Sequence, residues 1–303
     1  MDVVAHLPPP LLAHLRAVLG ADHTLTPATG WKSLEDAVRR LPSDVAVVDP
    51  GADGTVRTAE IVSLVRRYPS LPVLIYTVLS PQSMRAVVEL SAHGVNQVVL
   101  HRFDDEPRRL LEMLEQQPGV TLSDALLDRL AVPLAVLPAA LVRAIEQLFR
   151  RPLGFASADD LARVASMPRR TLYRVLEGAG LASPSTMVRA ARLLRAYAYL
   201  RDSGHSVEDV AVKLGYSSRQ LFGRHVREAF GVAPIDLRRR VAPLECVDCL
   251  AALLTTSGAE DHDPDDDAPT ADEGGDAGDS AGTPRRIAPV AGDRRGPKKA
   301  SGA

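Results

Sequence analysis

Residues 206–224 read SVEDVAVKLGYSSRQLFGR, and residues 157–174 read SADDLARVASMPRRTLYR in a similar order. Each segment opens with a serine that has an aspartate three positions later, which is typical of a capped helix start. A short apolar helix, a tight break and a second helix with several arginines follow in both. The pattern predicts two helix-turn-helix units in tandem.

The later unit has the clearer spacing. Apolar residues at 207, 210, 211 and 214 predict one buried face, and Gly215 ends the first helix without steric cost. In the second helix Phe222, Val226 and Phe230 recur every four residues and face inward. The residues left to face outward are Arg219, Gln220, Arg224 and Arg227. Arginine pairs well with guanine and glutamine with adenine in the major groove, so these residues are candidate DNA contacts.

The earlier unit follows the same plan. Pro168 begins its second helix, where the missing N–H costs nothing, and Leu172 and Leu176 face inward. The outward candidates for DNA contact are Arg169, Arg170, Tyr173 and Arg174. Between the units, residues 186–200 predict one long helix that would hold the two arginine-bearing helices about 34 Å apart, on successive major grooves. Further arginines are expected to contact phosphates or to be solvated: Arg189, Arg192, Arg195, Arg238, Arg239 and Arg240.

Charge is unevenly distributed along the 303 residues, although the net charge is only -2. Residues 137–241 hold 18 Arg or Lys against 9 Asp or Glu, whereas residues 1–118 hold 11 against 14. Residues 260–279 hold 10 Asp or Glu and no Arg or Lys, so a basic block lies between two acidic segments. This asymmetry favours nucleic acid as the partner of residues 137–241.

Residues 137–241 resemble the AraC-type (AraC/XylS family) DNA-binding domain. The resemblance is carried by the following positions: Met167, residues 170–174, residues 192–196, Leu200, residues 210–217, Phe222, Arg224, residues 230–231 and Pro234. It implies a bacterial-type transcription regulator that reads promoter DNA with two recognition helices. The sequence departs from the family at Pro168, where serine is common, and at Leu176 and Val226, where an aromatic residue is preferred.

Residues 1–118 alternate five expected strands with five expected helices, a pattern that predicts an α/β domain with a parallel sheet covered on both faces. The order resembles a response-regulator receiver domain, which implies a flavodoxin-like five-stranded fold. In that resemblance Asp49 ends the strand of the phosphoacceptor, and residues 72–77 form the strand of the switch hydroxyl.

The chemistry of receiver phosphorylation is incomplete in this sequence. The reaction needs Mg²⁺, which prefers several carboxylate oxygens, but residues 5–8 read AHLP where the family has an acidic pair. His101 and Arg102 stand where the family has Lys-Pro. We therefore interpret Asp49 as a turn former beside Pro50 rather than a phosphoacceptor. The alternative is a phosphate-independent receiver that signals by binding a partner or by dimerising.

The remaining segments are less informative. Residues 119–136 are expected to link the domains, as a connecting helix or a dimer contact, and residues 257–303 have the composition of a disordered tail. A lone Cys246-x-x-Cys249 predicts two reduced thiols just past the folded domain. With no long apolar run and with Asp2 near the start, we expect a cytoplasmic protein that is neither secreted nor membrane-bound.

The function predicted by these features is sequence-specific DNA binding, with an all-α C-terminal domain as the reader. The expected partner is double-stranded promoter DNA, with RNA polymerase and a second copy of the chain as further candidates. No cofactor or metal is expected. An adaptor that uses both domains to bind proteins remains as an alternative. An enzyme is disfavoured because the sequence has no Ser/His/Asp order, phosphate-cradling glycine loop or metal-ligand cluster.

Overall fold

The computed structural model of the chain describes residues 1–21, 23–115 and 121–255. The tail expected over residues 257–303 therefore lies outside the described residues. The α/β region and the helical region that follows it belong to one compact unit. In the described part of the chain, no helix has the length and apolarity needed to cross a membrane.

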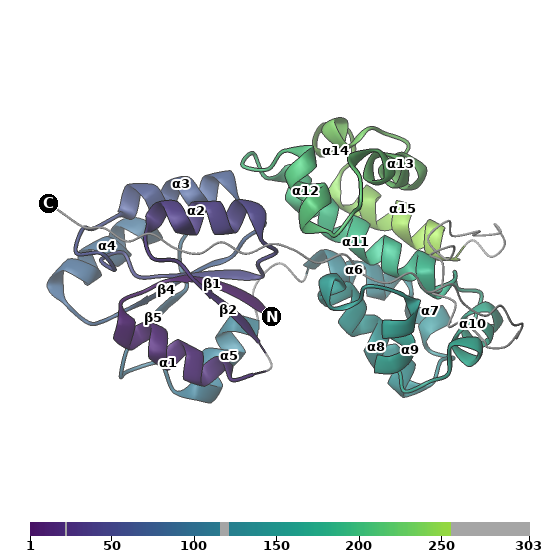
Figure 1. Cartoon of the computed structure of the whole chain (residues 1–303), viewed down its shortest axis with the longest axis horizontal. Helices are drawn as coiled ribbons and strands as arrows, with labels where there is room; N and C mark the ends of the chain where they lie inside the picture. The colour runs from purple at the N-terminus through teal and green to yellow at the C-terminus, as the bar shows by residue number, and fades with distance from the viewer. Residues whose placement is uncertain (22, 116–120, 256–303) are drawn as a thin grey trace, which may run out of the picture. The chain divides into compact units, whose positions relative to one another are not determined.

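Five parallel strands form the N-terminal sheet (Figure 1). They are β1 (Asp2–His6), β2 (Thr24–Pro27), β3 (Val45–Val48), β4 (Val73–Thr77) and β5 (Val98–Leu100). Their order, β2-β1-β3-β4-β5, is the 2-1-3-4-5 order of flavodoxin-like doubly wound folds. In the register of the central strand, Val47 pairs with Ala5 on β1 and with Leu74 on β4. The predicted fold class of this region is confirmed.

Helices cover both faces of the sheet. Figure 1 shows α1 (Pro9–Leu19) and α5 (Pro107–Glu115) on one face, and α2 (Trp31–Arg40), α3 (Thr58–Arg67) and α4 (Pro81–Ser91) on the other. Alternate strand residues enter the two cores, so Val47 packs toward α1 and α5 while Val48 packs toward α2 and α3. Because both faces are buried, the strands read as continuous apolar runs.

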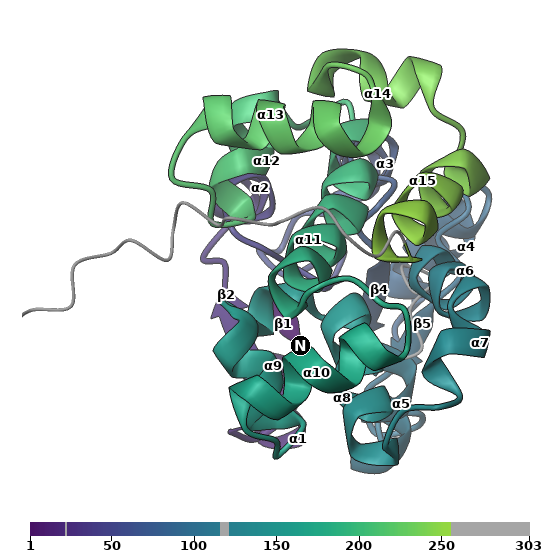
Figure 2. The same cartoon turned by 90° about the vertical axis from the view of Figure 1, so that its right-hand side faces the viewer.

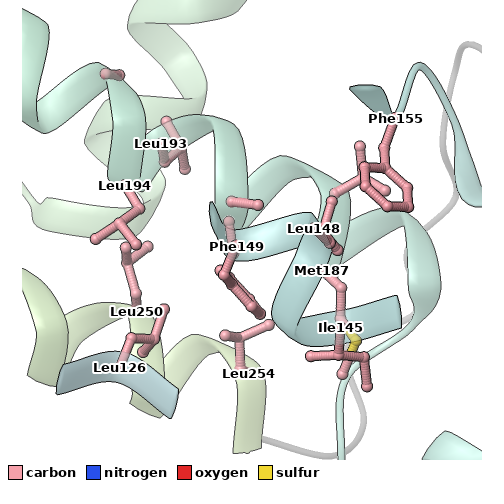
Figure 3. Packing of buried hydrophobic residues seen from close by; sticks show 14 of the residues in the cluster. Leu126, Ile145, Leu148, Phe149, Phe155, Met187, Leu193, Leu194, Leu250 and Leu254 are labelled. Atoms are coloured by element: carbon pink, nitrogen blue, oxygen red, sulfur yellow. The ribbon is translucent and has the colours of Figure 1, made fainter. Parts of the chain in front are cut away.

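The remaining helices share one hydrophobic core. They are α6 (Thr121–Arg129), α7 (Ala131–Leu134), α8 (Ala139–Arg150), α9 (Ala158–Val164), α10 (Arg169–Gly178), α11 (Pro184–Arg201), α12 (Val207–Lys213), α13 (Arg219–Phe230), α14 (Pro234–Arg240) and α15 (Pro243–Thr255), with a short 3-10 turn, η2 (Pro152–Gly154). Figure 3 shows Leu126, Phe149, Leu194 and Leu250 of α6, α8, α11 and α15 in this core. Burying each such side chain stabilises the fold by about 1.5–3 kcal/mol.

The core extends beyond residues 137–241 in both directions. Leu126, Leu130 and Leu134 of α6 and α7 are buried in it, so residues 121–134 pack with the helical region. On the other side, α15 buries Leu250 and Cys246. The expectation that the cysteines follow the folded domain is therefore wrong. It failed because residues 243–255 form a helix with its own apolar face, which the spacing of two cysteines does not indicate.

Candidate nucleic-acid interface

The helix pair α12–α13 is built from strong local signals. Ser206 Oγ accepts a hydrogen bond from Asp209 N at 3.1 Å, and Asp209 Oδ2 accepts one from Ser206 N at 2.9 Å. These reciprocal bonds satisfy two N–H groups that would otherwise lack partners at the start of α12. Gly215 adopts φ 74° in the turn that follows, a conformation that favours glycine. The capped start and the glycine break are both as the sequence predicts.

Helix α13 has one buried apolar face and an exposed polar face on the opposite side. Its start is capped by Ser218 Oγ, which accepts a hydrogen bond from Leu221 N at 3.1 Å. Phe222, Val226 and Phe230 are buried in the helical core, as the four-residue spacing predicts. The four candidate contact residues on the opposite side are all exposed: Arg219, Gln220, Arg224 and Arg227.

The helix pair α9–α10 has the same arrangement, but its turn contains a serine where the turn of α12–α13 contains a glycine. Asp160 Oδ2 accepts a hydrogen bond from Ser157 N at 3.2 Å, so the start of α9 is capped as predicted. Leu172 and Leu176 of α10 are buried. In the turn, Ser166 adopts φ 52°, the left-handed conformation that Gly215 adopts in the other pair. A residue with a side chain is strained there, a feature that the sequence analysis missed.

The candidate contact residues on α10 differ in their exposure and in the contacts that they make within the protein. Arg170 and Arg174 are exposed. Arg169 is also exposed but lies 3.4 Å from Asp159 through its Nη1 atom, and its guanidinium stacks over the Tyr173 ring at 5.7 Å. Tyr173 is half-buried, with its hydroxyl 3.4 Å from Ser185 Oγ. Arg170 and Arg174 are therefore better disposed than Arg169 and Tyr173 to reach a ligand.

Helix α11 connects the two helix pairs. It spans 18 residues, about 27 Å at 1.5 Å per residue, and Figure 2 shows it running between α9–α10 and α12–α13. Small residues such as Ala190, Ala191 and Ala196 allow neighbouring helices to pack closely around it, and most of its surface is buried. A buried helix that packs against both pairs restricts how far they can move relative to each other.

Two arginines of α11 are engaged within the protein rather than directed to solvent. Arg192 Nη2 donates hydrogen bonds to the carbonyls of Phe155 and Ala156, at 3.0 and 2.8 Å. Arg195 Nη2 donates to Asp44 Oδ1 at 2.9 Å. The expectation that these arginines contact phosphates or are solvated is therefore wrong, because tertiary contacts invisible in the helical pattern occupy them. Arg238, Arg239 and Arg240 are exposed at the end of α14, and Arg189 is half-buried.

Asp49 lies at the end of β3, largely buried, and its neighbours are neutral donors. Its Oδ1 accepts hydrogen bonds from Gly51 N at 2.9 Å and from Thr77 Oγ1 at 3.0 Å. Burial raises the pKa of the Asp49 carboxyl, and the two hydrogen bonds oppose that rise. The bond to Gly51 is the turn contact expected of an aspartate two residues ahead of a glycine.

The surroundings of Asp49 do not fit a magnesium ion. The end of β1 offers His6, whose Nδ1 is 3.2 Å from the carbonyl of Ala28, and residues 5–8 contain no carboxylate. His101 is directed elsewhere, since its Nδ1 lies 3.0 Å from Tyr76 Oη and also contacts the Asp105 carboxylate. Among the residues that the structure describes, no group of three His, Cys, Asp or Glu side chains is placed to hold a metal ion. Magnesium needs more oxygen ligands than Asp49 alone supplies.

The capped helix pairs and their exposed arginines define a helix-turn-helix protein of the DNA-binding class. A family model described as "Helix-turn-helix domain" matches residues 161–240. The chain is similar to the regulatory protein SoxS of Salmonella typhimurium, with 30% identity over 101 residues that cover 33% of this chain and 92% of SoxS. The chain belongs to the AraC family of transcription regulators.

Other relatives match over shorter parts of their length. The activator RhaS of Escherichia coli is 33% identical over 81 residues, 27% of this chain and 29% of RhaS. The regulator VirS of Mycobacterium tuberculosis is 36% identical over 87 residues, 29% of this chain and 25% of VirS. The chain thus spans less than a third of the length of either relative. Full-length FixJ from B. japonicum gives a TM-score of 0.35 at 18% identity, covering 75% of this chain and 94% of FixJ, a likeness too low to carry an inference.

Proposed function

We propose that the chain binds promoter DNA sequence-specifically with both helix pairs at once. Helices α10 and α13 would act as the recognition helices and enter successive major grooves on one side of the duplex. The observation that carries the proposal is the matched exposure of arginines on α10 and α13, while the opposite faces of both helices are buried in one core with α11.

The contact residues divide by the chemistry of their side chains. Arg170 and Arg174 on α10, with Arg219, Gln220 and Arg224 on α13, are proposed to read base edges. Arg169, Tyr173 and Arg227 are proposed to support them by contacting the sugar-phosphate backbone. Backbone contacts set position and affinity, and base contacts set sequence preference.

The α/β domain is proposed to regulate without being phosphorylated at Asp49. The support is chemical: Asp49 accepts hydrogen bonds from Gly51 and Thr77, and within the described residues it belongs to no cluster of carboxylates that could share a magnesium ion. Incubation with acetyl phosphate and Mg²⁺, followed by intact-mass measurement, tests this proposal. No mass increase is expected, and stoichiometric phosphorylation that is lost in Asp49→Ala would contradict it.

The domain limits proposed from the sequence are a receiver-like domain over residues 1–118, a connection over 119–136 and a DNA-binding domain over 137–241, whose core also takes in residues 121–134 and α15. RNA polymerase and a second copy of the chain are proposed partners of the regulatory step. Promoter binding would place the protein at the nucleoid, in the cytoplasm.

Fluorescence anisotropy with labelled promoter fragments at two salt concentrations tests the proposed function. We expect one fragment to bind at least about a thousand-fold tighter than unrelated DNA, a preference that persists at the higher salt. Weak binding that is blind to sequence and vanishes with salt would instead favour the adaptor hypothesis.

A further inference from the structure

Asp202, at the junction of α11 and α12, has no exposed surface and contacts the α/β domain. Its Oδ1 accepts a hydrogen bond from Ser70 N at 2.9 Å, and its Oδ2 accepts one from Ser70 Oγ. His205 Nδ1 lies 3.3 Å from Asp202 Oδ2. A buried carboxylate is costly unless it is paired and hydrogen-bonded, and here the α/β domain supplies two of its donors.

The backbone next to Asp202 joins the same contact. Gly204 N donates a hydrogen bond to the carbonyl of Arg67 at 3.1 Å, and Tyr68 Oη donates one to the carbonyl of Gly204 at 3.4 Å. A Cβ atom at Gly204 would lie 2.4 Å from the Tyr68 ring. Glycine is therefore required there for the two chain segments to approach this closely.

A buried lysine on α12 makes a second contact. Lys213 Nζ donates a hydrogen bond to the carbonyl of Val38, near the end of α2, at 2.7 Å, and lies 2.8 Å from His205 Nε2. A cation at a helix C-terminus is favoured by the carbonyls that have no partner within the helix. Its ammonium also lies 4.5 Å from the Tyr199 ring centre. Burial, followed by repulsion from Arg195, lowers the pKa of Lys213 to about 7.

Arg195 makes the third contact, from the middle of the buried α11. Besides Asp44 Oδ1, its Nη2 atom donates to the carbonyl of Ser43 at 3.1 Å. Asp44 Oδ2 in turn accepts a hydrogen bond from Asp2 N at 2.8 Å, which extends the network to the first residue of β1. The contact therefore reaches from the sheet to the helix that connects the two helix pairs.

We propose that Val38, Ser43, Asp44 and residues 67–70 of the α/β domain form a regulatory docking surface for the α11–α12 junction of the same chain. Docking holds the α12–α13 pair in place while leaving the outward residues of α13 exposed. Interfaces built from polar groups and hydrogen bonds can separate more readily than apolar ones. A signal that loosens the surface would leave α12–α13 held only by the helical core and so weaken simultaneous binding of both helix pairs to DNA. That consequence for DNA rests on the proposed function.

Two variants of the full chain, one on each side of the contact, test the proposal. Ser70→Asp places a carboxylate against buried Asp202, and Gly204→Ala places a methyl group against the Tyr68 ring. Ser63→Asp is the matched control, because it adds the same charge on the exposed face of α3. We expect amides of residues 202–213 to exchange hydrogen about ten-fold faster or more in both variants, with the control unchanged.

The same variants are titrated with the promoter fragment that binds best. We expect Kd to rise several-fold in Ser70→Asp and Gly204→Ala but not in Ser63→Asp. Unchanged exchange in both variants would overturn the docking surface, and faster exchange with unchanged Kd would overturn its regulatory role. If the unaltered protein prefers no DNA sequence, the proposed function fails, while the exchange measurement still decides whether docking exists.

Discussion

Substitution of Arg174 and of Arg224 tests whether each helix pair contributes separately to the affinity for DNA. Both side chains are exposed, one on α10 and one on α13. Arg224 makes a loose ion pair, with its Nε 4.0 Å from Glu228 Oε1 and more than half of both side chains exposed. An exposed pair of this kind contributes at most about 1 kcal/mol, so truncation should barely change the stability of the free protein.

Replacing either arginine by alanine should therefore change the affinity for DNA and leave the stability of the protein nearly unchanged. Loss of a base-reading arginine costs about 1–3 kcal/mol, which is roughly a 5- to 150-fold rise in Kd. Arg174→Ala and Arg224→Ala should each lie in that range. The double variant should lose about 2–6 kcal/mol, since distant sites that act on one duplex add. Arg108→Ala, on the exposed side of α5, removes the same charge and serves as the matched control.

Fluorescence anisotropy on the preferred fragment and on a scrambled fragment gives the measurement. An equal loss of affinity for both fragments would show that the arginine contacts a phosphate and not a base. A double variant no weaker than the worse single variant would refute simultaneous engagement of the two helices.

Three further predictions concern stability and chemistry. Ser166→Gly should raise the free energy of unfolding by about 0.5–1 kcal/mol in denaturant titrations, and Gly215→Ala should lower it by about 1 kcal/mol or more; equal effects of the same sign would contradict the strain at φ 52°. Because burial lowers the pKa of Lys213 to about 7, the native state binds fewer protons than the unfolded state between about pH 7 and the ordinary lysine value of 10.5, and stability should rise with pH over that range. Lys213→Met should abolish that rise, and the same pH dependence in the variant would exclude Lys213 as its source. Burial raises the pKa of Cys246 to about 12 and also raises that of Cys249, so native protein should react slowly with a thiol reagent at neutral pH and rapidly once unfolded; rapid reaction of both thiols in the native state would show that α15 is not packed as described.

The parts of this molecule that sequence could predict are those that depend on local chemistry. The serine-aspartate caps, the glycine break and the apolar spacing located α9, α12 and α13 because each signal acts within a few residues. The alternation of strands and helices over residues 1–118 predicted a parallel sheet covered on both faces, and the resemblance to receiver domains implied the flavodoxin-like fold.

The parts that were missed depend on contacts between distant segments. Burial of Asp202 requires Ser70, and the roles of Arg195 and Lys213 require Asp44 and Val38. Lys213 lies between Val210 and Leu214, on the buried side of a short helix, and this position alone indicates that its ammonium group needs a partner inside the protein. The partner could not be predicted, because it is a backbone carbonyl and any residue carries one.

A dimethyl sulfate footprint on the preferred promoter fragment, which reports methylation of guanine N7 in the major groove, tests most directly whether both helix pairs bind one duplex. Two protected major-groove segments are expected on one face, about 10 base pairs apart, with the segment assigned to α13 lost in Arg224→Ala and the other lost in Arg174→Ala. A single protected segment that both substitutions weaken alike would contradict this expectation.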